Sequence, residues 1–254
     1  MPDKKYVKSV IKALAILELL HERGELGVTE IGAALDMDKS TTFRLLSTLR
    51  EKGFAVAAPG SRKYAVGGKL FMLGQGMLRR HNVNPPLTLE LKKLAAATGE
   101  TVNLAVPDGL DVLYLDRHET KDIIKLAGSI GERRPMYCTS AGKAILARYR
   151  PEHAKALCSA FAFEPFTRFT HATPDSLLAD LATVRERGYA VDNQEHRLGI
   201  HCLGIALADK SGQPLAAVSI SIPQFRHEAD PGKHALCAKA LLEASDRLSA
   251  ALLA

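Results

Sequence analysis

The stretch DKSTTFRLLSTLREKG, residues 38 to 53, has the pattern of one amphipathic helix. Asp38 can cap its first turn and Gly53 can end it. At about 100° per residue, Thr42 and the leucines fall in one narrow sector, which must face a core. The opposite face and its flanks carry short hydroxyl side chains and cations, which suit phosphate oxygens and base edges in a DNA major groove. Alternatively, the serine and threonines of this first turn only cap the helix.

Two shorter helical patterns precede this one. Apolar side chains recur at helical spacing over residues 10 to 20, with Ser9 as the predicted N-cap and Gly24 as the end of the helix. A second helix is predicted over residues 28 to 35, and residues 36 to 38 form the turn to the third. Two short helices, a tight turn and a longer helix describe a helix-turn-helix.

A hairpin with basic residues near its tip is predicted after the third helix. Strand-like runs occupy residues 54 to 56 and 64 to 66, with a glycine between them. Such a hairpin is a wing whose cations contact the flanking DNA backbone, although an ordinary hairpin with solvated cations has the same pattern. The residues of the helix and the wing that we expect to contact DNA are Lys39, Ser40, Thr41, Phe43, Arg44, Ser47, Arg62 and Lys63.

The net charge of the chain, +6 at pH 7, belongs entirely to its first third. Residues 1–84 contain 14 Lys and Arg against 8 Asp and Glu, whereas residues 85–254 contain 20 of each kind. A basic module joined to a neutral one favours a polyanionic partner, here double-stranded DNA, although a need for solubility alone also accounts for the charge.

Two adjacent prolines at positions 85 and 86 interrupt the helical pattern and suggest a domain boundary. Before them a linker helix is predicted, although its two glycines, Gly74 and Gly76, each cost about 1 kcal/mol relative to alanine and can break it into two turns. The expected organisation is a winged helix-turn-helix domain over residues 1–67, the linker helix over residues 68–84 and a second domain over residues 85–254.

The second domain has the alternating pattern of an α+β fold. A helix beginning near Leu87 ends at Gly99, and two strands flank the turn Pro107-Asp-Gly109. Further helices open at Thr173-Pro174 and at Asp230-Pro231. Two more strands lie between them, over residues 203 to 208 and 215 to 222. These elements predict an antiparallel sheet with helices.

Small residues around Ser140 and Ala141 begin another predicted helix in this domain. They leave backbone N–H groups open at the positive end of the helix dipole, where carboxylates bind readily. Because every helix needs an N-cap, Thr139 or Ser140 alone does not establish a binding site.

Further polar residues can join that helix start. Alternation along residues 217 to 222 places Ser219 and Ser221 on one face of a strand and the apolar side chains on the other. Asp192 and Cys202 lie on segments that can bring a carboxylate and a thiol beside these serines. A solvent-exposed strand face has the same alternation, so this alternative stays open.

Enzymatic motifs are absent from the sequence. It contains no G-x-S-x-G elbow, no complete dinucleotide-binding loop and no Walker A motif. The compact candidates for metal ligands are His196, His201 and Cys202, but histidines in loops are more often solvated, so we expect no metal and no cofactor. A hydrolase or isomerase that uses Asp192, Cys202 and the serines is the alternative, although the sequence identifies no base for the thiol.

The compartment follows from cysteine usage and hydrophobicity. The four cysteines are widely spaced and include no C-x-x-C pair, so neither a disulfide framework nor a zinc knuckle is indicated. No run of about 18 apolar residues occurs, and the N-terminus has no apolar signal core. We therefore expect a cytoplasmic protein without a membrane partner.

Four motifs, in this order along the chain, resemble the IclR family of bacterial transcriptional regulators. They are KSTTFRLL at residues 39 to 46 with KGF at 52 to 54, YAVG at 64 to 67, CTSAGKA at 138 to 144, and RGYAVD at 187 to 192 with Glu195. The resemblance covers essentially the whole chain. It implies a winged helix-turn-helix, a linker helix and a GAF-like ligand domain, assembled as dimers or tetramers. It also implies binding of small organic acids, often to control catabolic genes.

The resemblance further implies which residues bind the effector. They are the N–H groups of Ser140 and Ala141, the polar side chains of Asp192, Cys202, Ser219 and Ser221, and apolar walls from Ile123, Leu126 and Ile200. Arg134 lies beside these walls, at a position that would also suit an apolar side chain.

The expected function is a ligand-responsive, DNA-binding transcriptional regulator without enzymatic activity. Its expected partners are operator DNA, a small organic acid and further copies of the same chain. A third alternative is a structural interaction module, which would bind DNA with no response to any metabolite.

Overall fold

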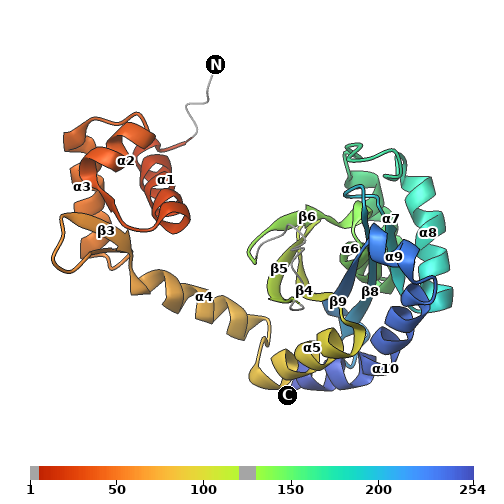
Figure 1. Ribbon diagram of the computed structural model, residues 1–254. Helices are drawn as coiled ribbons and strands as arrows, with labels where there is room; N and C mark the ends of the chain where they lie inside the picture. The colour runs from red at the N-terminus through yellow and green to blue at the C-terminus, as the bar shows by residue number, and fades with distance from the viewer. Residues whose placement is uncertain (1–5, 120–129) are drawn as a thin grey trace. The chain divides into compact units, whose positions relative to one another are not determined.

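The computed structural model describes residues 6–119 and 130–254, and the chain divides into two compact units, Met1–Met77 and Leu78–Ala254 (Figure 1). Helices and antiparallel strands occur in both units, which confirms the predicted α+β class. Among the described residues, the N-terminal unit has one hydrophobic core and the C-terminal unit has two.

The N-terminal unit is a helix-turn-helix with a small sheet. Its elements are α1 (Lys8–Arg23), β1 (Leu26–Gly27), α2 (Val28–Ala34), α3 (Lys39–Glu51), β2 (Ala55–Ala57) and β3 (Lys63–Val66). The strands form an antiparallel sheet in the order β1-β3-β2. Ile16 of α1, Ile31 of α2 and Leu46 of α3 are fully buried in the shared core. The helix-turn-helix and the hairpin predicted from the sequence are therefore confirmed.

The predicted amphipathic helix is α3. The N–H of Thr41 donates to Asp38 Oδ1 over 2.8 Å, so Asp38 caps the helix as predicted. Thr42 and Leu46 are fully buried. The chain leaves the helix through Gly53, whose positive φ of 77° is a conformation that glycine adopts without strain.

The predicted cap of α1 is wrong. The helix begins at Lys8, and Val7 is its N-cap. The N–H groups of Val10 and Ile11 both donate to the carbonyl oxygen of Val7. Ser9 therefore lies inside the first helical turn and is not its N-cap.

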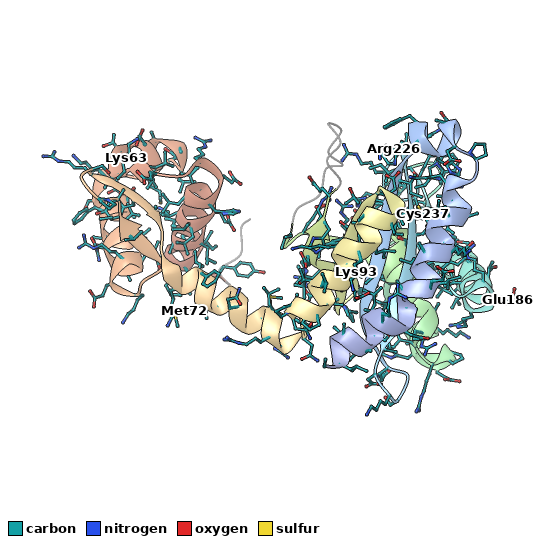
Figure 2. All side chains as sticks on the ribbon, turned by 60° about the horizontal axis from the view of Figure 1, so that its bottom comes forward. Lys63, Met72, Lys93, Glu186, Arg226 and Cys237 are labelled. Atoms are coloured by element: carbon teal, nitrogen blue, oxygen red, sulfur yellow. The ribbon has the colours of Figure 1, made fainter. Side chains whose placement is uncertain are left out.

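The predicted linker helix is α4 (Gly68–Arg80), which continues without a break through Gly74 and Gly76. It runs from the end of the N-terminal unit into the C-terminal unit. Its large apolar side chains are mostly exposed, Phe71 by 70% and Met72 by 64%. Figure 2 labels Met72 on this helix.

The C-terminal unit contains a six-stranded antiparallel sheet in the order β6-β5-β4-β9-β8-β7. The strands are β4 (Thr101–Asp108), β5 (Asp111–His118), β6 (Arg133–Pro135), β7 (Ala190–Asn193), β8 (Ile200–Ala208) and β9 (Pro214–Pro223). The helices are α5 (Pro85–Thr98), the single-turn η1 (Met136–Cys138), α6 (Ser140–Arg148), α7 (Pro151–Ala160), α8 (Pro174–Arg187), α9 (Gln224–Ala229) and α10 (Lys233–Leu253).

Helices cover both faces of this sheet (Figure 1). Leu91 of α5 and Leu241 of α10 pack with Ile220 of β9 in one core. Ile145 of α6 packs in the other core, which also contains Ala217 of β9. Because neighbouring strand residues point to opposite faces, β9 separates the two cores.

The start of the last helix differs from the prediction. The side chain of Asp230 accepts the N–H of Gly232 over 3.0 Å in a turn, so α10 begins only at Lys233, and the short α9 precedes that turn. In the part of the chain that the structure describes, no helix is both long enough and apolar enough to cross a bilayer.

Ser219 lies on a covered face of β9, not a solvated one. Its side chain is 2% exposed, and its cross-strand partner on β8 is Gly204. The alternative of a solvent-exposed serine face is therefore wrong at this position.

Two glycines allow the start of α6 to lie against neighbouring backbone. A Cβ atom on Gly204 would lie 2.6 Å from the carbonyl oxygen of Ser140, and a Cβ on Gly142 would lie 2.2 Å from Met136 Cα. Both distances are shorter than atoms tolerate, so neither position accepts a side chain without a backbone shift. This contact places the first turn of α6 directly over β8.

We expect Gly142→Ala to lower the free energy of unfolding of the C-terminal unit by roughly 1–3 kcal/mol, because the backbone at Met136 must move. Urea unfolding followed by circular dichroism measures the change. Gly74→Ala is the matched control: nothing lies within 4 Å of the added Cβ, and alanine favours a helix by about 1 kcal/mol over glycine. Unchanged or increased stability in Gly142→Ala would contradict the packing described.

Candidate functional site

A cavity lies where the start of α6 faces the strands of the C-terminal unit. The described residues that line it are Asn103, Tyr114, Arg117, Ile130, Glu132, Arg134, Thr139, Ser140, Asp192, His196, Arg197, Ile200, Cys202 and Ser221. Its free volume is about 30 Å³, room for one or two water molecules. A larger ligand therefore enters only if lining side chains move.

The structure brings together many of the residues that the sequence singled out for effector binding. Those that line the cavity are Ser140, Asp192, Ile200, Cys202 and Ser221. Ala141 is buried in the first turn of α6. Ser219 is not among the described lining residues, because its neighbour Gly204 lies against Ser140. Ile123 and Leu126 lie outside the described residues.

Three polar side chains form a row across β7, β8 and β9. Asp192 pairs with Cys202, and Cys202 pairs with Ser221. Such partners point to the same face of a sheet. Ser221 Oγ accepts hydrogen bonds from Cys202 Sγ at 3.3 Å and from Asn103 Nδ2 at 3.2 Å. The hydroxyl hydrogen of Ser221 is then left to donate to a ligand.

The first turn of α6 presents backbone N–H groups. Thr139 is the N-cap: its Oγ1 accepts the N–H of Gly142 at 3.2 Å, and its carbonyl oxygen accepts the N–H of Lys143 at 2.9 Å. The N–H groups of Ser140 and Ala141 precede these at the positive end of the helix dipole. This geometry suits a carboxylate.

The cavity also contains Arg134, to which the sequence assigned no role. Its Nε and Nη2 donate to the two carboxylate oxygens of Glu132 at 2.8 and 3.0 Å, and its guanidinium lies 5.3 Å from the centre of the Tyr114 ring. Arg117 and Arg197 are lining residues too. With three arginines against two carboxyl groups among the described lining residues, the cavity favours an anion.

Asn103 is a site residue that the sequence analysis missed, although a signal was present. It is the polar residue within the otherwise apolar strand run VNLAV, and an amide buried there needs a partner. Tyr114 and Glu132 carried no comparable signal, because their place in the cavity depends on the pairing of β5 and β6.

Burial controls the protonation of the cavity side chains. It raises the pKa of Asp192 to about 7, and the negative charge of Glu195 adds to this effect. Burial raises the pKa of Cys202 to about 12 and lowers the pKa of His196 to about 4. At neutral pH the thiol is therefore protonated and the imidazole uncharged, so the cavity lacks the thiolate that a cysteine nucleophile requires.

The metal-ligand candidates from the sequence do not converge. His196 and Cys202 line the cavity, but His201 points to the opposite face of β8. There its ring lies against His227, with ring centres 4.6 Å apart.

The predicted DNA-contacting residues lie at the surface of the N-terminal unit. On α3, Lys39, Ser40, Phe43 and Arg44 are exposed and the other two are half-buried, namely Thr41 and Ser47. Arg62 and Lys63 are exposed where the chain enters β3, and Figure 2 shows Lys63 on this hairpin. The N–H of Ala58 donates to the carbonyl oxygen of Lys63 over 2.9 Å and closes the turn.

Two family models match the chain. The IclR helix-turn-helix domain matches residues 9–59, and the model described as bacterial transcriptional regulator IclR C-terminal matches residues 75–250. Together they cover both units.

Individual proteins are similar over nearly the whole chain. The HTH-type transcriptional regulator KdgR of Dickeya chrysanthemi is 33% identical over 233 residues, which is 92% of this chain and 75% of that protein. The transcriptional repressor IclR of Escherichia coli K12 is 34% identical over 228 residues, 89% of this chain and 83% of that protein. The crystal structure of the Thermotoga maritima IclR has a TM-score of 0.85 at 32% identity and covers 97% of this chain and 99% of that one.

The raised pKa of Asp192 predicts a pH-dependent stability. A carboxyl group whose pKa rises on folding destabilises the folded state above about pH 7, and this penalty fades as the pH falls from about 7 to 4. We expect Asp192→Asn to have a larger free energy of unfolding than the wild type at pH 8, with a difference that shrinks over that range. Urea unfolding at several pH values measures it. A difference that does not change with pH would contradict the raised pKa.

Proposed function

The chain belongs to the IclR family of bacterial transcriptional regulators, which are DNA-binding proteins and not enzymes, and we propose that a small organic acid bound in the C-terminal cavity controls its operator binding. One observation carries this proposal: the positive end of α6, Arg134 and the row Asp192–Cys202–Ser221 face a single cavity. A carboxylate and a neighbouring oxygen fit this combination of groups.

The charges support a pose for the acid. Its carboxylate accepts hydrogen bonds from the backbone N–H groups of Ser140 and Ala141 and lies near the guanidinium of Arg134. A keto or hydroxyl oxygen on the adjacent carbon then meets Asp192 and Ser221. Asp192 suits this oxygen at neutral pH, because its raised pKa lets it donate as well as accept a hydrogen bond.

The proposed effectors are keto, hydroxy, sugar or aromatic acids. We propose Ile200, Ile123 and Leu126 as the apolar contacts of the acid, and Ser219, which is buried on β9, as a further polar residue of the site. Acids of this kind are intermediates of breakdown pathways, which supports a role in the control of catabolic genes.

We assign DNA binding to residues 1–67, the connection to residues 68–84 and effector binding to residues 85–254. The exposed face of α3 and the basic hairpin support the first assignment, with Lys39, Ser40, Thr41, Phe43, Arg44, Ser47, Arg62 and Lys63 as contacts. The net positive charge of the first third of the chain provides attraction to phosphate.

A dimer or a tetramer fits the apolar surface of the helices. On α1, Ile11 is 52% exposed and Leu14 is 53% exposed, and on α4 Phe71 is 70% exposed. Exposed apolar side chains that share a helix mark interfaces between proteins. A second copy of the chain would bury them and present a second winged helix to the other half of a palindromic site.

The two kinds of DNA contact can be separated by mutation. We expect Arg44→Ala to weaken operator binding by about 1–3 kcal/mol and to relax sequence preference, because Arg44 lies on the exposed face of the recognition helix. Arg62→Ala should weaken binding to all sequences alike and reduce the salt dependence. Fluorescence anisotropy with an operator selected from random DNA measures both. Equal, sequence-independent losses in the two variants would contradict these roles.

Effector binding has its own test. A thermal-shift screen of the four acid classes identifies a ligand, and calorimetry then measures its affinity. We expect Ser221→Ala to lose about 1–3 kcal/mol of effector affinity by leaving an oxygen without its donor, and Arg134→Met to lose at least as much. Ser159→Ala, exposed on α7, is the matched control. Undiminished affinity in both cavity variants would place the ligand elsewhere.

A further inference from the structure

Three histidines from three different elements meet in a second cleft of the C-terminal unit. His201 is on β8, His227 is on α9 and His234 is on α10, and all three line the cleft. The ring centres of His201 and His227 lie 4.6 Å apart, and those of His227 and His234 lie 6.0 Å apart. We call these three residues the histidine row.

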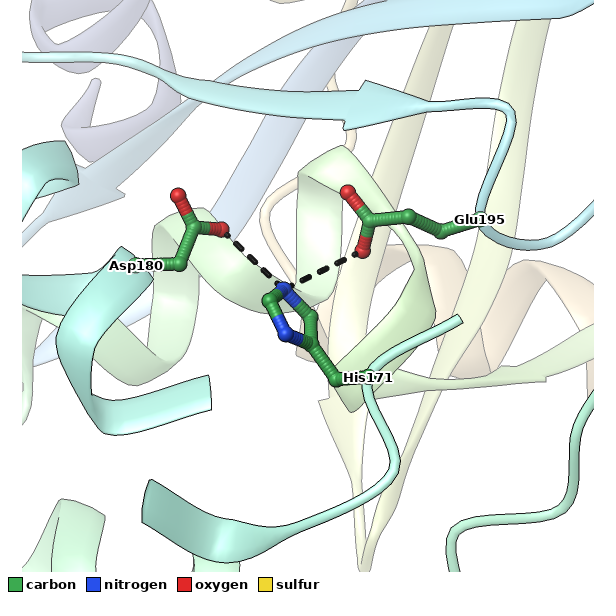
Figure 3. A group of neighbouring side chains, drawn as sticks. All are labelled: His171, Asp180 and Glu195. Atoms are coloured by element: carbon green, nitrogen blue, oxygen red, sulfur yellow. Dashed lines mark ion pairs between the residues drawn. The ribbon is translucent and has the colours of Figure 1, made fainter. Parts of the chain in front are cut away.

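The histidine row differs from the ion pairs that line another part of the same cleft. There His171 Nε2 lies 3.5 Å from Asp180 Oδ2 and 3.6 Å from Glu195 Oε2 (Figure 3). The buried ammonium of Lys143 holds both carboxylates. Within the part of the chain that the structure describes, no carboxylate forms an ion pair with a ring of the histidine row.

Burial keeps the histidine row poor in hydrogen-bond partners. His201 is 8% exposed, and His227 Nδ1 is buried and has no partner among the described residues. Burial disfavours a charged imidazolium, so it lowers the pKa of His201 and of His234, and the neighbouring rings of the row add to this effect. The rings of His201 and His234 are therefore uncharged at neutral pH.

Two charged side chains act on the ends of the histidine row. Arg187, at the end of α8, adds positive charge near His234 and contributes to the lowering of its pKa. Glu228, on α9, acts in the opposite direction on the pKa of His201. Its side chain is exposed, so water weakens its attraction for a proton on the ring.

The other charged side chains of α9, α10 and the turn between them have partners of their own. Arg226 and Lys233 lie 3.3 and 3.1 Å from the buried carboxylate of Glu100. Asp230 is exposed and accepts the N–H of Gly232 in the turn. None of these groups replaces a counter-ion for the histidine row.

Helix α9 is the weakest of the three elements that meet in the row. It has six residues, and none of them is buried. A helix of this length is unstable in water without tertiary contacts. The N–H of Gln224, its first residue, donates to the carbonyl oxygen of Gly199 over 2.8 Å, directly before Ile200 of the effector cavity. An element with so few buried contacts opens locally before the rest of the unit unfolds.

We propose that mild acid protonates the histidine row and releases α9 from β8. Positive charges on rings 4.6 and 6.0 Å apart repel one another, and release lets water solvate them. Release also breaks the contact between Gln224 and Gly199 beside the effector cavity. The switch itself does not rest on the proposed function.

The direction of the pH dependence follows from proton uptake. In the released form the rings are hydrated, and each regains the ordinary histidine pKa of about 6.5. The released form then binds more protons than the docked form, so it is favoured as the pH falls below about 6.5. Each ring that gains a proton on release raises the equilibrium constant for release by up to about tenfold per pH unit.

Hydrogen exchange of the full-length protein, measured by mass spectrometry at pH 7 and pH 5, tests the proposal. The rates are corrected for the intrinsic pH dependence of amide exchange. We expect the protection of residues 224–230 to fall by about tenfold or more at pH 5, whereas residues 152–160 of α7 keep their protection. Equal protection of residues 224–230 at both pH values, or a parallel loss in α7, would overturn the proposal.

Variants that keep the rings but remove the protonation sites complete the test. In the double variant His201→Phe/His234→Phe, the exchange of residues 224–230 should no longer respond to pH. His153→Phe is the matched control, because His153 is exposed on α7 with its ring 4.4 Å from that of Tyr149, and it should respond as the wild type does.

A single variant covers the case in which the double variant does not fold. His234→Gln changes one half-buried ring and should reduce the acid response of residues 224–230 by severalfold. A wild-type acid response in a folded variant that lacks His234 would also overturn the proposal.

Discussion

The buried ammonium of Lys143 is the constraint on which the C-terminal unit depends. Its side chain is 1% exposed and lies 2.6 Å from Asp180 Oδ2 and 2.5 Å from Glu195 Oε1. A buried ammonium costs several kcal/mol unless it is paired, so both carboxylates must be in place. Although burial acts to raise the pKa of Asp180, the neighbouring His171 and Lys143 hold it below its usual range. Helix α6, helix α8 and the turn after β7 are thereby tied together.

The motif CTSAGKA at residues 138 to 144 has one physical explanation. Thr139 caps α6, Gly142 allows close contact with the backbone of Met136, and Lys143 reaches the two carboxylates. Each residue places the same helix start over the sheet. The cavity is a consequence, because the N–H groups of this first turn then face the polar row on the strands. One sequence motif therefore positions the helix start that lines the candidate site.

Local signals in the sequence predicted most of the fold. Asp38 caps α3, and Gly99 and Gly188 end α5 and α8 in the left-handed conformation. The hairpin of β4 and β5 was predicted, but its turn is at Gly109 and Leu110, because Pro107 and Asp108 still pair with β5. The cap at Ser9 was wrong, because the choice of the first helical residue depends on backbone bonds that composition does not reveal. Strand alternation placed Ser221 on the correct face. The alternation does not show how much of this face of β9 helix α6 covers. The position of Ser219 outside the described cavity lining was therefore not predictable.

Contacts between distant segments were harder to predict. His171, Asp180 and Glu195 have no motif spacing, and only the packing of α8 against the turn after β7 brings them together. Local patterns indicated the polar candidates and the family resemblance joined them into one effector site, whereas the role proposed for Arg134 needed the pairing of β5 with β6.

An acid bound in the cavity is proposed to change how the protein binds DNA. The most direct test is the operator dissociation constant of the full-length protein, measured by fluorescence anisotropy with and without a saturating acid that calorimetry shows to bind. We expect a change of about 5- to 150-fold, the range of ordinary allosteric coupling. An acid that binds the cavity yet leaves the operator dissociation constant unchanged would contradict it.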